Sequence, residues 1–132
     1  MKLCFEAHKD QQDKSGVPYV FHPIHLAEQM NDEYTTVVAL LHDVMEDSSF
    51  TLEDLQKMGY PEAVLAALVL MTHEKDIPYM DYVQKIKTNV IAKTVKLADL
   101  QHNSDITRLD EITDKTLARV EKYKQAIALL EE

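Results

Sequence analysis

The sequence predicts a single all-α domain. Apolar residues recur every three or four positions through most of the chain, which is the spacing of one helix face. In no window do apolar and polar residues alternate well enough for a strand. The chain has 132 residues, the size of one ordinary domain. It shows no repeat, linker or low-complexity tract, so we treat residues 1–132 as one domain.

The first two helices are expected over residues 6–14 and 22–30. The first has a polar face and should end near Gly16 and Pro18, because both residue types interrupt helices. The second has Pro23 in its first turn, where the N–H that proline lacks would be unpaired in any case.

A third helix is expected over residues 34–47, beginning with an apolar run and ending in a cluster of ionisable residues. Thr51 is then predicted to cap a short helix, with Asp54 three residues further on as in a capping box. Gly59 should end that helix, because glycine readily adopts the left-handed conformation found after helix ends.

The second half of the chain contains further helical windows, each opened by a proline or a capping residue. The window over 61–72 is apolar nearly all round and is expected to be the most buried. These windows are 61–72 after Pro61, an amphipathic 78–88 after Pro78, 90–103 after Asn89, and a final helix from Thr113 or Asp114 through Leu130.

Composition excludes several classes of function. The net charge of −9 repels a polyanion, so we expect no nucleic acid partner, although a metal or a local basic patch could still receive a small phosphate ester. Two glycines are too few for a glycine-rich phosphate loop. One cysteine excludes an internal disulfide. With no signal peptide and no apolar run near 18 residues, we expect a cytoplasmic protein with no membrane partner.

Four ionisable side chains lie at the end of the third helix: His42, Asp43, Glu46 and Asp47. Residues three and four apart share a helix face, so Asp43 should lie with both later acids. Burying charges in such an apolar neighbourhood costs several kcal/mol unless they are compensated. A bound cation is the simplest compensation.

Two other helices also carry polar groups in apolar places. Asp99 is on the inward stripe of its helix, with Asn103 one turn later, while His22 and His25 bracket a helix start. Imidazoles and carboxylates drawn from three helices would form a mixed nitrogen and oxygen site, suited to an ion such as Mn²⁺ or Fe²⁺. Spacing alone does not choose between His22 and His25.

Each of these groups also has an ordinary structural explanation. Glu46 and Asp47 fit a solvated helix end, and Asp99 fits an ion pair with a lysine of its own helix. His8 and His102 fit surface or packing positions better than ligand positions. Helix geometry alone does not show that the segments meet.

Three motifs together resemble a known family. They are "AHKDQQDKSGVPYVFHP", "ALLHDVMEDS" and "VKLADLQHN", in that order, and they run from about residue 7 to residue 103. They resemble the hydrolase domain of the RelA/SpoT family and the single-domain small alarmone hydrolases, which belong to the HD phosphohydrolase superfamily. The resemblance implies a single HD-domain helical bundle.

The resemblance also implies a site and an activity. The activity is that of a metal-dependent phosphohydrolase that releases pyrophosphate from the 3′ position of (p)ppGpp, and the partner is a small nucleotide or phosphate ester. The metal is one Mn²⁺, with Fe²⁺ or another divalent ion as alternatives. The implied residues are His22, His42, Asp43 and Asp99 as metal ligands, Glu46 and Asp47 as the catalytic acids, and Lys14, Ser15 and Asn103 as substrate contacts.

The sequence departs from the family at two positions near the substrate. Asp13 replaces an arginine that packs against the purine, and Leu100 replaces a basic residue. The metal site is therefore kept while the substrate site is altered. Two alternatives stay open: an HD phosphohydrolase of another nucleotide or phosphate ester, and a non-catalytic module that binds metal or nucleotide. The presence of Glu46 and Asp47 argues against the second, since pure binding does not need them.

Overall fold

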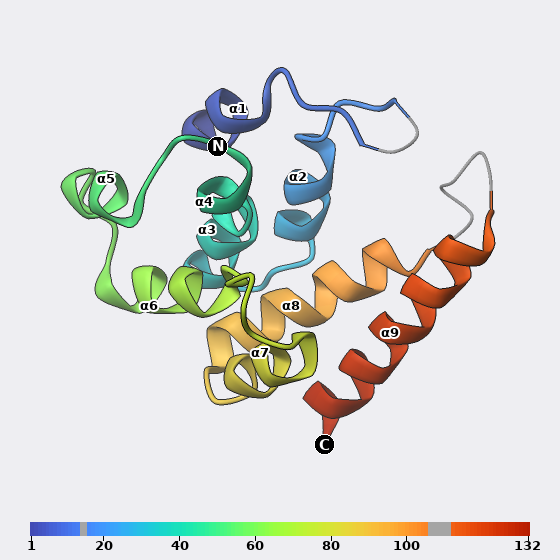
Figure 1. Cartoon of the computed structure of the whole chain (residues 1–132). Coiled ribbons are helices and arrows are strands. Elements are labelled where there is room, and N and C mark those ends of the chain that lie inside the picture. The colour runs from blue at the N-terminus through green and yellow to red at the C-terminus, as the bar shows by residue number, and fades with distance from the viewer. Residues whose placement is uncertain (14–15, 106–111) are drawn as a thin grey trace.

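The computed structural model describes residues 1–13, 16–105 and 112–132, and within these ranges it is helical (Figure 1). The only pairing of extended backbone in these ranges is an isolated bridge between Gln12 and Pro18. The all-α prediction is therefore confirmed. The helices are α1 (Lys2–His8), α2 (Phe21–Glu28), α3 (Glu33–Leu41), α4 (Val44–Asp47), α5 (Leu52–Lys57), α6 (Glu62–Met71), α7 (Tyr79–Ile86), α8 (Val90–Asn103) and α9 (Asp114–Glu131).

Helix α3 lies at the centre of the bundle, packed against α2, α6 and α8 (Figure 1). Each of these helices buries apolar side chains fully, among them Leu26, Val38, Leu68 and Val95. Helix α9 packs along the outside of α8 and α7. The helices that carry His22 and Asp99, α2 and α8, thus pack directly on the central helix.

Side-chain caps start the helices where the sequence predicts them. Thr51 and Asp54 form the expected capping box at α5. The Asn89 side chain accepts a hydrogen bond from Ala92 N at 3.0 Å, and the Thr113 hydroxyl accepts one from Thr116 N at 3.2 Å. Gly59 follows α5 with a φ of +85°, a left-handed conformation that suits glycine.

The helix expected over residues 6–14 is wrong in its extent, because α1 ends at His8. After His8 the chain folds back on itself instead of continuing the helix. Asp13 N donates to Val17 O at 2.8 Å, and Tyr19 N donates to Gln11 O at 2.8 Å. Backbone groups that would form hydrogen bonds within a longer helix thus bond to residues 17 and 19 instead.

The single helix expected over residues 34–47 is also wrong, because the chain breaks between α3 and α4 at His42 and Asp43. The His42 ring bonds to the carbonyl of Ala39 at 2.7 Å, which satisfies a group at the end of α3. Asp43 adopts φ −107° and ψ 4°, and its carbonyl starts α4 by accepting from Asp47 N at 2.9 Å. Glu46 and Asp47 therefore belong to a short separate turn.

The helix after Pro61 is less buried than its composition suggests. Leu68 of α6 is fully buried, but Val69 beside it is 47% exposed. Helix α6 packs against α3, α5, α7 and α8, but the face that carries Val69 is left in contact with solvent. The burial that we predicted for this helix from its apolar composition was therefore too high.

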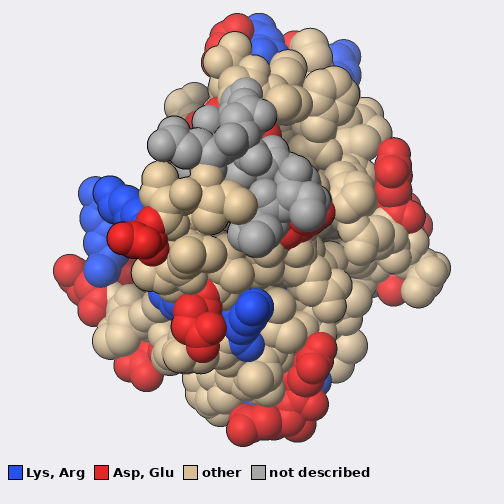
Figure 2. All heavy atoms as spheres, turned by 90° about the vertical axis from the view of Figure 1, so that its right-hand side faces the viewer, with Lys and Arg blue, Asp and Glu red and all other residues tan. Residues whose placement is uncertain are grey.

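The surface seen from the α9 side carries its Lys and Arg side chains in small groups, with acidic side chains close by (Figure 2). No helix in the described ranges has the length and apolar character needed to cross a membrane.

Truncating the core at Leu68 should destabilise the fold strongly. We expect Leu68→Ala to lower the free energy of unfolding by about 2–5 kcal/mol, because the cavity adds to the lost burial. Val69→Ala, one position along the same helix, should cost less than about 1 kcal/mol because its side chain is half exposed. Urea denaturation of both variants measures the difference, and equal losses would contradict this packing of α6.

Candidate metal centre and active site

Three buried side chains from three segments meet at the centre of the site. His22 of α2 places Nε2 2.8 Å from Oδ1 of Asp99 on α8, and His42 Nε2 lies 3.4 Å from the same oxygen. The exposed fractions of His22, His42 and Asp99 are 6%, 3% and 5%. The segments that sequence spacing alone could not bring together are thus in contact.

Asp43 lies beside this group. Its Oδ2 is 3.1 Å from His42 Nε2 and also accepts a hydrogen bond from the Tyr19 hydroxyl. Ligand atoms of His22, His42 and Asp43 all lie within 4.8 Å of one another, a spacing compatible with one metal ion. The structure therefore gathers all four side chains predicted as ligands, while their role as ligands stays a prediction.

His42 supplies a test of whether a cation fits. A carbonyl oxygen only accepts hydrogen bonds, so the contact with Ala39 O puts a proton on Nδ1 of His42. Nε2 is buried without a hydrogen bond, facing the carboxylate oxygens of Asp43 and Asp99. A lone pair directed at two carboxylates is repulsive unless a proton on Nε2 or a bound cation supplies positive charge there. The arrangement therefore suits a divalent cation.

The electrostatics of the protein alone point the same way. Burial opposes a charged His42, but the carboxylates of Asp43 and Asp99 outweigh it and hold the imidazole pKa well above its usual value. Burial likewise opposes ionised Asp43, yet the neighbouring His42 lowers the pKa of that carboxyl to about 2. The site therefore holds ionised carboxylates around a position that favours positive charge.

Asp99 has further partners on its own helix. Lys96 Nζ lies 2.9 Å from Oδ2, and Asn103 Nδ2 donates to Oδ1 at 3.0 Å. Burial disfavours ionised Asp99, but Lys96 together with both imidazoles holds the carboxyl pKa well below its usual value. The ion pair with a lysine of the same helix is therefore present together with the imidazole contacts, so the two explanations of Asp99 do not exclude each other.

Glu46 and Asp47 lie on α4 outside the buried group, and both are exposed. Glu46 accepts a hydrogen bond from His73 N, and Asp47 accepts one from Gln11 Nε2 at 3.3 Å. Partial burial, aided by the negative charge of Asp43, raises the pKa of both carboxyls. They are thus better proton acceptors than ordinary surface acids.

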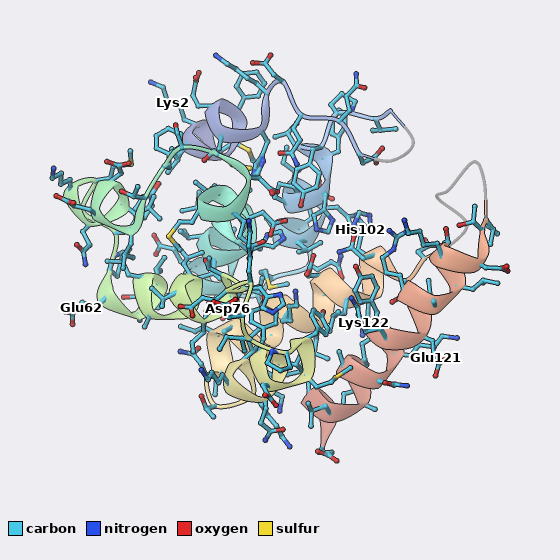
Figure 3. All side chains as sticks on the ribbon, viewed as in Figure 1. Lys2, Glu62, Asp76, His102, Glu121 and Lys122 are labelled. Carbon is cyan, nitrogen blue, oxygen red and sulfur yellow. The ribbon has the colours of Figure 1, made fainter. Side chains whose placement is uncertain are left out.

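The structure separates the two histidines that spacing left equivalent. His22 is buried against Asp99, whereas His25 is exposed and its ring lies 4.3 Å from that of His102. The ring of His102 (labelled in Figure 3) is stacked on that of His22, with the two planes 9° apart and the two Nδ1 atoms 2.6 Å apart. His102, considered only a surface or packing residue from sequence, contacts a predicted ligand directly.

The loop predicted to face the substrate is described only in part, because Lys14 and Ser15 lie outside the described residues. Asp13 accepts a hydrogen bond from Val17 N at 3.0 Å through Oδ1. Its carboxylate therefore supports the loop where the family has a purine-packing arginine. Asn103 remains at the site, but its amide contacts Asp99.

Helix α9, no residue of which was assigned a chemical role from the sequence, forms a wall against Tyr79 of α7. Nζ of Lys122 (labelled in Figure 3) lies 4.6 Å from the ring centre of Tyr79 on α7. The ring centres of Tyr123 and Tyr79 are 6.4 Å apart. Tyr79 in turn lies 6.0 Å from Lys96 Nζ, next to Asp99. Periodicity could not reveal this wall, because it marks a helix face but not the neighbour that the face meets.

Comparison with known proteins identifies relatives that are named as enzymes of guanosine-3′,5′-bis(diphosphate) hydrolysis, alongside others named as GTP pyrophosphokinases. The chain is 33% identical over 135 residues to the guanosine-3′,5′-bis(diphosphate) 3′-pyrophosphohydrolase MESH1 of Mus musculus, covering 90% of this chain and 74% of that protein. It is 31% identical over 132 residues to the guanosine-3′,5′-bis(diphosphate) 3′-pyrophosphohydrolase of Aquifex aeolicus, covering 91% of this chain and 18% of that protein. No family model matches the chain.

A solved structure supports the same relationship. The chain matches a metazoan ortholog of SpoT, described as hydrolysing ppGpp, with a TM-score of 0.75 and 25% identity over 98% of this chain and 82% of that one. The first relatives found by sequence are much longer, and the chain covers 18%, 13% and 7% of their lengths.

Removing Lys96 should expose the electrostatic cost of burying Asp99. Lys96→Met keeps an unbranched side chain but deletes the ammonium 2.9 Å from the carboxylate. We expect the free energy of unfolding, measured with a metal chelator present, to fall by about 3–5 kcal/mol, the usual cost of breaking a buried pair. Lys93→Met, one turn earlier on α8, is the matched control. A loss no greater than the control's would show that Asp99 does not depend on Lys96.

Proposed function

The chain belongs to the HD-domain family of guanosine-3′,5′-bis(diphosphate) 3′-pyrophosphohydrolases, and from this premise we propose that it hydrolyses that nucleotide, releasing pyrophosphate from its 3′ position. The observation that carries the proposal is the buried His42 Nε2 that faces Asp43 and Asp99. An acidic pair with raised pKa values lies one turn further along the chain. Cation ligands and proton carriers are thus adjacent.

His22, His42, Asp43 and Asp99 would hold one divalent ion. We assign Mn²⁺, because a set of imidazole nitrogens and carboxylate oxygens suits an ion of intermediate hardness; Fe²⁺ is the nearest alternative. Such an ion, when bound, polarises a phosphoryl group and lowers the pKa of a coordinated water.

Glu46 and Asp47 are the groups that we assign to proton transfer. A general base works best when its pKa approaches the operating pH, and partial burial moves both carboxyls in that direction. One takes the proton of the attacking water, and the pair delivers a proton to the leaving oxygen of the ribose. Exposure of both side chains keeps them accessible to a substrate from solvent.

Asn103, Lys14 and Ser15 are assigned to the nucleotide. The Asn103 amide has donors for Asp99 and an acceptor oxygen for a sugar hydroxyl. Lys14 would contribute a positive charge to a phosphate, and Ser15 a hydroxyl. The substrate is accordingly a small molecule. A cytoplasmic location belongs to the same proposal, supported by the single cysteine of the chain.

A second candidate is hydrolysis of another nucleotide or phosphate ester at the same centre. The observation that favours it is Asp13, whose carboxylate supports the loop through Val17 N in the place of a purine-packing arginine. A negative side chain there weakens the recognition of a multiply charged guanine nucleotide without affecting the buried centre.

The deciding experiment supplies guanosine-3′,5′-bis(diphosphate) with Mn²⁺ and follows pyrophosphate release, next to a panel of other nucleotides and phosphate esters. Release of pyrophosphate from the guanosine substrate supports the first candidate. An intact guanosine substrate together with turnover of another ester would establish the second.

Asp43→Asn should abolish both metal binding and metal-dependent hydrolysis. The amide is nearly isosteric with the carboxylate, so the change removes charge while keeping shape. We expect bound Mn²⁺, measured by elemental analysis after dialysis, to fall below a tenth of the wild-type level, in line with the need for deprotonated ligands. A variant that keeps both full metal occupancy and activity would mean that Asp43 is not a ligand.

The double change Glu46→Gln with Asp47→Asn should separate catalysis from metal binding. Neither side chain is assigned as a ligand, so Mn²⁺ binding should remain. Turnover should fall by roughly 10²-fold or more, the usual range for lost acid–base groups. Steady-state kinetics and elemental analysis on the same preparation measure both effects. Loss of the metal in this variant would make the pair ligands and refute their assigned role.

A further inference from the structure

Three side chains of the N-terminal segment lie beside the site but have no part in the mechanism above. They are His8 at the end of α1, and Gln11 and Tyr19 in the turn that leads to α2. The segment folds back so that Tyr19 N donates to Gln11 O at 2.8 Å. This backbone bond brings the three side chains to the same side of α4, against which α1 packs.

Gln11 connects a buried histidine to the exposed Asp47. Its Oε1 lies 2.8 Å from His8 Nδ1, and its Nε2 donates to Asp47 Oδ2 at 3.3 Å. A carboxylate only accepts, so the amide must direct its NH₂ group toward Asp47 and its oxygen toward His8. His8 is 1% exposed and is held by the core. The orientation of Gln11 is therefore anchored from inside the protein.

Tyr19 makes the corresponding contact with Asp43. Its hydroxyl donates to Oδ2, the carboxylate oxygen that lies 3.1 Å from His42 Nε2. A carboxylate only accepts hydrogen bonds, so the Tyr19 hydroxyl must be the donor in this contact. The Tyr19 ring centre lies 5.0 Å from that of His8, so the two contacts share one support.

We propose that His8, Gln11 and Tyr19 form a support layer that positions the two carboxylates: Tyr19 orients Asp43 for the metal, and Gln11 orients Asp47 for proton transfer. All three are positioning residues, because Tyr19 and Gln11 hold the carboxylates and His8 supports Gln11 and Tyr19. The proposal rests on the proposed function for the role of Asp47. The proposal has two halves that predict different losses. Changing Tyr19 should lower the metal affinity, and changing Gln11 should lower turnover.

The Tyr19 half is tested by metal titration without any nucleotide. Tyr19→Phe removes only the hydroxyl, and Tyr34→Phe, an exposed position on α3, is the matched control. We expect Tyr19→Phe to weaken Mn²⁺ binding by about 10–100-fold, the range for lost partners of metal ligands. Isothermal titration of metal-free protein measures it. An affinity equal to that of Tyr34→Phe would overturn this half.

The Gln11 half is tested by a near-isosteric change. Gln11→Glu keeps an acceptor for His8 but loses the donor to Asp47, while Gln12→Glu adds the same charge at the adjacent exposed position. We expect kcat for pyrophosphate release to fall about 10-fold in Gln11→Glu, since misplaced catalytic groups cost up to about 10²-fold. KM, Mn²⁺ affinity and the melting temperature should match the control. Equal kcat values in the two variants would overturn this half.

These measurements also separate the proposal from the proposed function. If the wild-type protein binds Mn²⁺ but releases no pyrophosphate, the proposed substrate is wrong. The Tyr19 titration then still decides whether the support layer orients Asp43. A wild-type protein that binds no Mn²⁺ would refute both the metal centre and the support layer.

Discussion

The buried carboxylate of Asp99 is the charge around which the rest of the structure is arranged. Such a group costs several kcal/mol in an apolar core unless positive charges and hydrogen bonds surround it. Lys96 supplies one partner from the same helix, while His22 and His42 come from α2 and the end of α3. Because these partners come from separate helices, the packing of α2 and α8 on α3 also sets the geometry of the site. A shift of either helix would leave the charge uncompensated.

The break between α3 and α4 is the second part of that constraint. Successive residues of a continuous helix point about 100° apart, which would separate the side chains of His42 and Asp43. The break instead lets Asp43 Oδ2 approach His42 Nε2 to 3.1 Å, while the His42 ring satisfies the carbonyl of Ala39. The same residues thus end one helix, begin another and face a common point. This local geometry explains why a dipeptide of adjacent histidine and aspartate can serve one centre.

Most of the helices and the polar groups of the site could be predicted from local sequence. Residue spacing did not show which helices meet. Capping side chains such as those of Thr51 and Asn89 form hydrogen bonds to residues only three positions away, so local sequence was enough to predict them. The choice of His22 over His25 depends on contact with Asp99, 77 positions away, which no helical period encodes. The early end of α1 depends on pairing with the returning chain, and the α9 wall depends on which helix lies opposite Tyr79. Contacts between distant segments were therefore the part that residue spacing could not supply; for the metal ligands, only the resemblance to the family indicated them.

The pKa values of four neighbouring carboxyls are shifted in opposite directions. Asp43 and Asp99 face imidazole and ammonium groups, which outweigh burial and hold their pKa values low. Glu46 and Asp47 are partly desolvated and lie near the charge of Asp43, which raises theirs. Groups whose pKa values are moved apart in this way are suited to different tasks, the first as permanently ionised ligands and the second as proton carriers. The ionised state of Asp43 is itself one cause of the raised pKa values in the acidic pair. The centre and the acidic pair are therefore coupled through charge as well as through the short α4 turn.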